Sequence, residues 1–162
     1  MNNLIVAFLR KEDPDIYGRM IVDIWNYSYE ELEDTHDYIQ WLFPLFETSA
    51  HSSNAPVLTI SLAEKINADE VCNSSLKHSL VTMHAFYDGV SHWARHDDHN
   101  LLRITRILKS SALLIGKKFS RDFFDFIMQR CRELNFKPSS EVMEFWNSAM
   151  NAEISQYREM GC

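Results

Sequence analysis

Apolar residues recur every three or four positions along most of this chain, which is the period of amphipathic helices. The pattern is clearest around residues 29–43, 70–90 and 100–115, and it returns near 120–134 and 140–158. No segment alternates with a period of two, and no glycine-, serine- or proline-rich linker divides the chain. The sequence therefore predicts an all-α fold, a compact single-domain bundle of six or seven helices over residues 1–162.

Local signals indicate where these helices begin and end. Ser28 and Glu31 form a capping box ahead of a helix over 29–43, and Pro44 ends that helix. Gly116 is a typical residue just after a helix. Comparable start signals precede other helices: Asp13 with Pro14, Ser61 with Glu64, and Asn67 with Glu70.

Two stretches are unusually rich in polar and aromatic side chains. The first is "LEDTHDYIQWLFPL", and on a helical wheel its Leu32, Ile39 and Phe43 form a core face. Glu33, His36 and Gln40 then form a polar strip along one edge, and Trp41 lies on the opposite side. A histidine beside an apolar face is usually a hydrogen-bonded core residue, so the strip alone does not define a site.

The second stretch is "HNLLRITRILKS", which opens a helix that is apolar almost all round and is therefore expected at the centre of the fold. Arg103 and Arg106 share its remaining narrow face. Partly buried guanidinium groups need acceptors to offset their desolvation. We therefore expect one of these arginines to contact an acid of the first stretch: Glu33, Asp34 or Asp37.

The composition narrows the range of functions. The net charge of −7 disfavours nucleic-acid binding. The three cysteines have no CxxC spacing, which argues against a disulfide framework or a cysteine zinc site. No signal peptide or membrane-spanning run is apparent, so a soluble, cytoplasmic protein is expected. No phosphate loop, nucleophile elbow or dinucleotide fingerprint occurs, so an enzyme is not favoured and no cofactor is expected.

Both stretches resemble signature segments of the opioid growth factor receptor conserved-region family, whose members carry LEDxHxYIQWLFPL and then HNNLRITRILKSL. "PVLTISLAEKI" and "AFYDGV" resemble weaker segments between and around them, so the resemblance runs from about Ile21 to Ala149. Leu101 stands where the second motif has another asparagine. The long acidic or repeat-bearing extensions of animal members are not found in this sequence, so a nuclear or membrane-associated location follows only by analogy.

The resemblance implies a receptor for a small opioid peptide, Met-enkephalin. From the residues themselves, a short peptide or other small ligand is expected at a polar seam between the two signature helices. Carboxylates would bind its ammonium, arginines its carboxylate, and aromatic rings its side chains. The expected ligand-binding residues are Glu33, Asp34, His36, Tyr38, Gln40, Trp41, His99, Asn100, Arg103 and Arg106.

Two alternatives remain open at this stage. In the first, the seam only holds the fold together, and the domain is a structural or protein–protein interaction module. In the second, Glu33, His36 and His99 bind a metal, because Glu-x-x-His spacing occurs in di-iron bundles. Such bundles use the motif twice, and the chain has one copy, so no metal ligand is assigned.

Overall fold

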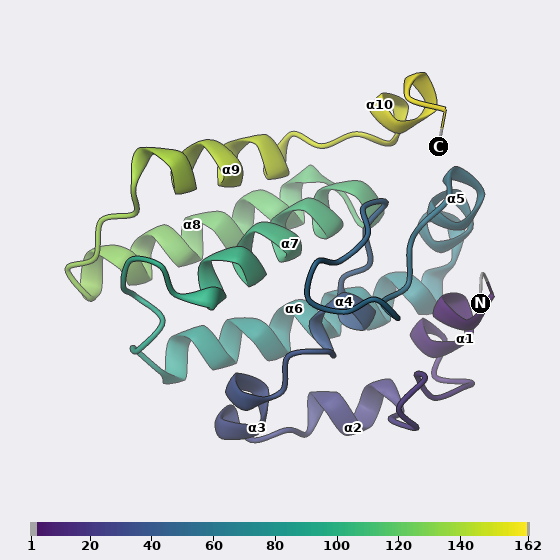
Figure 1. Cartoon of the computed structure of the whole chain (residues 1–162), viewed down its shortest axis with the longest axis horizontal. Helices are drawn as coiled ribbons and strands as arrows, with labels where there is room; N and C mark the ends of the chain where they lie inside the picture. Colours follow the sequence, from purple (N-terminus) through teal and green to yellow (C-terminus); the bar gives the residue numbers. More distant parts are fainter. Residues whose placement is uncertain (1–2, 162) are drawn as a thin grey trace.

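The computed structural model describes residues 3–161, and within that range the chain forms ten α-helices with two isolated β-bridges (Figure 1). The all-α prediction is confirmed. The helices exceed the expected six or seven because several are short pieces of one or two turns. They are α1 (Leu4–Leu9), α2 (Ile21–Trp25), α3 (Tyr29–Asp34), α4 (Ile39–Leu42), α5 (Ile60–Ala68), α6 (Glu70–Gly89), α7 (His99–Leu114), α8 (Lys117–Glu133), α9 (Ser140–Met150) and α10 (Ile154–Glu159).

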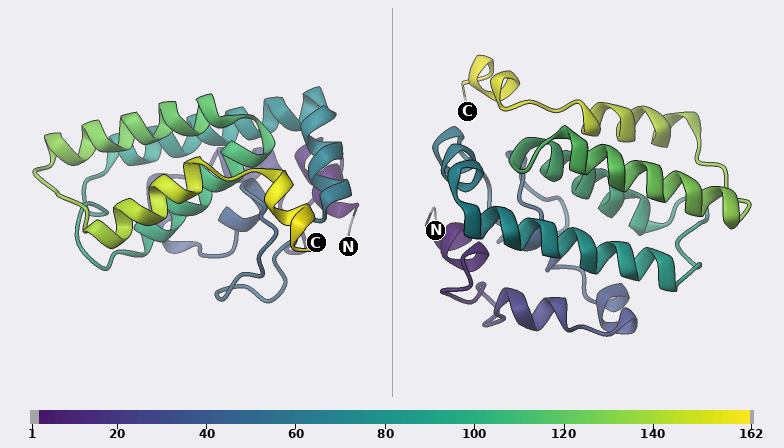
Figure 2. Two further views of the ribbon diagram at one scale, coloured as in Figure 1. Left: turned by 90° about the horizontal axis from the view of Figure 1, so that it is seen from above. Right: turned by 180° about the vertical axis from the view of Figure 1, so that it is seen from behind.

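Helix α7 is central, as its apolar sequence predicts. It packs against α8 and α9 on one side, against α5 and α6 elsewhere, and faces the α3–α4 segment (Figures 1 and 2). Ile104, Ile107 and Leu108 are fully buried. Leu102 is the exception, because 59% of its surface is exposed. One side of this otherwise enclosed helix therefore reaches solvent.

The predicted helix after Pro14 is wrong, because residues between α1 and α2 form turns. The buried Asp15 carboxylate accepts hydrogen bonds from the backbone N–H groups of Tyr17 and Arg19. An aspartate that binds nearby backbone in this way competes with helix formation. Arg19 also pairs with both Asp15 and Asp37, so this turn is tied to the first signature stretch.

The continuous helix predicted over 29–43 is also wrong. The capping box at Ser28 is present and begins α3, but that helix ends at Asp34. Thr35 is extended, with φ −88° and ψ 124°, and a second short helix begins only at Ile39. The segment is thus two short helices joined by a non-helical link of residues 35–38, and the link sits beside α7.

Other helix ends differ by small shifts. Thr59 and Asp69 cap α5 and α6 in place of the expected Ser61 and Asn67. Asp98 caps α7, and Gly116 follows it with φ +114°, where a glycine is favoured. These caps fix the start of α7 and thereby place its first polar side chains opposite α3.

Candidate functional site

The polar edge of α7 lies along the whole first signature stretch. Four of its side chains, spaced three or four residues apart, contact that stretch in the same order along both segments. Asn100 and Arg103 reach α3 and the link that follows it. Arg106 donates to the Phe43 carbonyl oxygen at 2.9 Å. Ser110 donates to the Pro44 carbonyl oxygen, also at 2.9 Å. One helix edge therefore holds the irregular backbone of residues 32–44 in place.

Arg103 explains why α3 stops. Its Nη1 donates to the Leu32 carbonyl oxygen at 2.8 Å. Its Nη2 donates to the carbonyl oxygens of Thr35 at 2.8 Å and Glu33 at 3.2 Å. The last carbonyls of a helix have no partner within the helix, and here a buried guanidinium from another helix supplies it. Tyr38 donates to the same Leu32 oxygen and is fully buried.

A carboxylate and an amide complete this buried cluster. The Asn100 amide donates to Glu33 Oε2 at 3.0 Å and to Asp98 Oδ1 at 2.9 Å. The Asn100 carbonyl oxygen accepts from Tyr87 at 3.3 Å and from Arg103 at 3.4 Å. The expected contact between Arg103 and Glu33 exists, with Nη1 4.0 Å from Oε2. The main acceptors of Arg103 are nevertheless backbone carbonyls.

Two histidines approach the same carboxylate. His92 Nε2 lies 3.0 Å from Glu33 Oε2, and His99 Nε2 lies 3.3 Å from Oε1. Burial opposes ionisation of Glu33, but the hydrogen bonds from Asn100 and His92 outweigh it and leave the pKa of Glu33 below its usual value. Burial and the charge of Arg103 lower the pKa of His99.

Both shifts make the folded state less stable in acid. Because the pKa of His99 is lower in the folded state, its contribution is complete above the usual histidine pKa and declines as pH falls below it. The contribution of Glu33 is complete above the usual glutamate pKa and declines as pH falls further. We expect Glu33→Gln to make unfolding free energy fall less steeply between pH 5 and 3.5, as measured by urea denaturation. An unchanged slope in the variant would contradict this description of Glu33.

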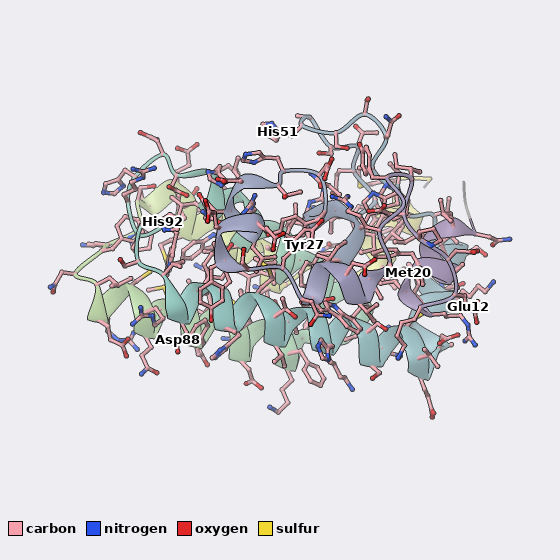
Figure 3. The ribbon with its side chains drawn as sticks, turned by 90° about the horizontal axis from the view of Figure 1, so that it is seen from below. Glu12, Met20, Tyr27, His51, Asp88 and His92 are labelled. Atoms are coloured by element: carbon pink, nitrogen blue, oxygen red, sulfur yellow. The ribbon has the colours of Figure 1, made fainter. Side chains whose placement is uncertain are left out.

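An open pocket of about 510 Å³ lies beside this cluster. Its walls come from the link and start of α4, from the polar edge of α7, and from the loop that follows Pro44. Figure 3 shows His51 on that loop, where it projects beyond the helices. The lining residues are His36, Ile39, Gln40, Thr48, Ser49, Ala50, His51, His99, Leu102, Arg103 and Arg106.

Arg106 differs from Arg103 in how its charge is compensated. It is half-buried, and its single hydrogen bond within residues 3–161 goes to the Phe43 carbonyl. No carboxylate of these residues lies within ion-pair distance of its guanidinium. Burial lowers the pKa of Arg106 to about 10, and the charge of Glu47 opposes that shift only in part. A guanidinium has five N–H donors, so most of those on Arg106 have no protein acceptor.

The structure brings five of the ten expected ligand-binding residues together. The ones that line the pocket are His36, Gln40, His99, Arg103 and Arg106. Glu33 and Asn100 lie behind them in the buried cluster. Gln40 is nine-tenths buried, donates to Ser49 Oγ at 3.3 Å, and leaves its own side-chain oxygen without a partner.

The other three of the ten also lie away from the pocket. Tyr38 and Trp41 are buried in the core and cannot form its walls. The break after α3 changes the direction in which α4 points its side chains, so the helical wheel placed Trp41 on the wrong side. Asp34 is exposed and does not line the pocket. Asp37, the third acid expected near the arginines of α7, pairs with Arg19 instead.

The metal alternative finds no geometric support among residues 3–161. No group of three or more histidine, cysteine, aspartate or glutamate side chains there has the spacing to hold a metal ion. His92, His96 and His99 would share one face if a single helix carried them, but turns separate α6 from α7 and they do not lie on one helix. Glu33 instead accepts hydrogen bonds from Asn100 and contacts two histidines.

Sequence reasoning missed two parts of this site. Ser110 continues the three- and four-residue spacing of Asn100 and Arg103, so the series of polar positions in an apolar helix could have identified it. The loop residues from Thr48 to His51 carry no comparable signal. Their position depends on the bend after Pro44 and on a hydrogen bond between Gln40 and Ser49.

The fold and site together define an all-α domain in which two polar sequence segments pack against each other beside a pocket. The sequence model described as the opioid growth factor receptor (OGFr) conserved region matches residues 6–93. This range includes the first signature stretch and stops before the second. Because it covers more than half of the chain, this protein belongs to the opioid growth factor receptor conserved-region family.

Named relatives agree with this assignment. The chain is 30% identical to opioid growth factor receptor-like protein 1 of Mus musculus, over 78% of this chain and 31% of the relative. It is 32% identical to the opioid growth factor receptor of Homo sapiens, over 69% of this chain and 20% of the relative. The chain thus spans between a fifth and a third of these relatives. No solved structure matches the fold.

The sequence shows no membrane-spanning run, and the helices of the structure can be compared with that expectation. Among the described helices, none combines the length and the apolar character that crossing a lipid bilayer demands. The longest, α6, has charged and polar residues along its exposed side.

Proposed function

We propose that this domain binds a small ligand, such as a short peptide, in the pocket between the link at residues 35–38, the loop at 48–51 and α7. The observation that supports the proposal is the difference between the two arginines. Both arginines line the pocket, but the terminal nitrogens of Arg103 donate to three backbone carbonyls of the fold, whereas Arg106 has one backbone acceptor. Natural selection for stability alone gives no reason to keep a half-buried charge without a partner.

The size and lining of the pocket support the same proposal. Its volume of about 510 Å³ lies within the range of small-ligand sites, which is roughly 300–1,000 Å³. Ile39 and Leu102 supply apolar surface, and His36 and Gln40 supply polar groups. The polar groups of such sites orient the ligand, and in this pocket they outnumber the apolar ones.

The names of the relatives suggest a peptide ligand. The human relative is named the opioid growth factor receptor, and a short peptide offers a terminal carboxylate for an arginine. Because Tyr38 and Trp41 are buried, the aromatic walls expected for peptide side chains are absent from the pocket. Ile39, Leu102 and the histidine rings are the surfaces left for that role.

Filling the pocket tests this proposal. Ala50 is exposed on the loop wall, so Ala50→Trp should occupy the space without disturbing the buried cluster. We expect the wild type to show a ligand-induced rise in melting temperature in a screen of short peptides and metabolites, and Ala50→Trp to lose it. Val81→Trp, at an exposed position of α6 outside the pocket, is the matched control and should respond like the wild type.

The competing function is a structural or protein–protein interaction module that takes no small ligand. Its support is the buried cluster, in which Glu33, Asn100 and Arg103 serve the fold. A screen with no response in the wild type, or an equal response in Ala50→Trp, would favour this second function over ligand binding.

A further inference from the structure

The described lining of the pocket is basic, although the net charge of the protein is −7. Its described lining residues include two arginines and three histidines and no acid. Two carboxylates close to the lining residues are both engaged in contacts within the protein. Glu33 contacts Asn100 and two histidines, and Glu47 pairs with Lys109 and accepts from Tyr157. The described lining therefore presents positive charge and hydrogen-bond donors, and it includes no carboxylate that would bind a cation.

We propose that the pocket recognises its ligand through an oxyanion bound by Arg106, and that it does not recognise an ammonium group. This inference rests on the proposed function and specifies the ligand class. It replaces the zwitterionic ligand expected from the sequence with an anionic one. The oxyanion can be a carboxylate or a tetrahedral phosphate or sulfate, since all of these fit the planar fork of a guanidinium.

The position of Arg106 fits this role. Its hydrogen bond to the Phe43 carbonyl anchors one nitrogen, so the side chain is oriented before a ligand arrives. The remaining donors are available on a group that is already partly removed from water. Hydrogen bonds to a charged partner are strongest where water is partly excluded, because the local dielectric is lower.

Arg103 cannot fill the same role. Its terminal nitrogens already donate to the carbonyl oxygens of Leu32, Glu33 and Thr35. An anion that recruited those donors would leave buried carbonyls without partners, which is costly. Arg103 and Arg106 lie three positions apart in the second signature segment. Arg103 therefore stabilises the backbone, and Arg106 is left to bind the anion.

Three probes distinguish the chemical groups. Sulfate is a tetrahedral oxyanion, N-acetylphenylalanine carries a carboxylate and no ammonium, and phenylalaninamide carries an ammonium and no carboxylate. We expect the first two to cause saturable chemical-shift changes at pocket residues in two-dimensional NMR spectra. We expect phenylalaninamide to cause none. If sulfate binds and N-acetylphenylalanine does not, the source of the oxyanion is a phosphate- or sulfate-bearing ligand.

Variants of Arg106 complete the test. Arg106→Gln keeps amide donors on a shorter side chain but removes the charge, and we expect it to weaken binding of whichever oxyanion binds the wild type about tenfold or more. Arg106→Lys keeps the charge and should retain part of the affinity. Arg121→Gln removes an exposed arginine of α8 outside the pocket and should bind like the wild type.

Several results would overturn the inference. These are binding of phenylalaninamide at the pocket, binding by Arg106→Gln equal to that of the wild type, or no binding of either oxyanion. The outcome for the proposed function is separate. If an uncharged or cationic ligand from the screen binds and Ala50→Trp abolishes the response, the pocket is a ligand site and only the oxyanion assignment fails.

Discussion

Arg103→Ala is expected to lower the free energy of unfolding by about 3–5 kcal/mol, the range seen when one partner of a buried charged contact is removed. Arg103 is 5% exposed. Among residues 3–161, its guanidinium is the only hydrogen-bond donor outside α3 to the carbonyl oxygens of Glu33 and Thr35. Without it, these oxygens lose their side-chain donor and Glu33 loses a nearby positive charge. Urea denaturation followed by circular dichroism measures the loss.

Arg103→Lys is the matched control for charge. An ammonium can replace the positive charge near Glu33, but it cannot place two nitrogens toward carbonyls on both sides of the break. We expect it to recover a minor part of the loss. A decrease of less than about 1 kcal/mol in Arg103→Ala, which is typical of a surface substitution, would show that the arginine does not hold this segment.

Asn100→Ala is expected to have the second largest effect, a loss of about 2–3 kcal/mol, because it leaves several buried polar groups without partners. Asn100 is fully buried and joins Glu33 and Asp98 through its amide, and Tyr87 and Arg103 through its oxygen. Removing it affects both the carboxylate of α3 and the cap of α7.

Asn147→Ala provides the comparison for Asn100. Asn147 is exposed on α9 and donates only to a carbonyl in its own helix, so its loss should cost about 0.5 kcal/mol or less. A double-mutant cycle of Asn100→Ala with Arg103→Ala should show coupling, since the two side chains share one hydrogen-bond network. Strictly additive losses would contradict a single buried cluster.

Much of the fold follows from local sequence signals. The 3.6-residue period predicts helices throughout, the apolar circumference of α7 predicts its central position, and Ser28 predicts the start of α3. The break after Asp34 does not follow from local signals, because residues 29–43 have a good helical pattern. It depends on Arg103, which is remote in sequence and stabilises the alternative backbone.

The candidate site was likewise predictable from the sequence only in part. The sequence patterns identified part of the set of side chains that meet there, including Glu33, His36, Gln40 and Arg106. Their roles depend on burial, and burial changes once the helix is broken. Trp41 then faces the core. Arg103 and Arg106 both line the pocket, but Arg103 is buried and donates to three backbone carbonyls, whereas Arg106 donates to one. The loop wall was not predictable, since its residues have ordinary turn composition.

The central claim concerns the two arginines of "RITR": Arg103 stabilises the fold, and Arg106 binds the ligand. The most direct test compares the unfolding free energies of Arg103→Ala and Arg106→Ala under the same conditions. We predict a loss of several kcal/mol for the first and a change within about 1 kcal/mol for the second, because Arg106 has no buried acidic partner to leave behind. Equal losses in the two variants would contradict the division and would identify both arginines as structural.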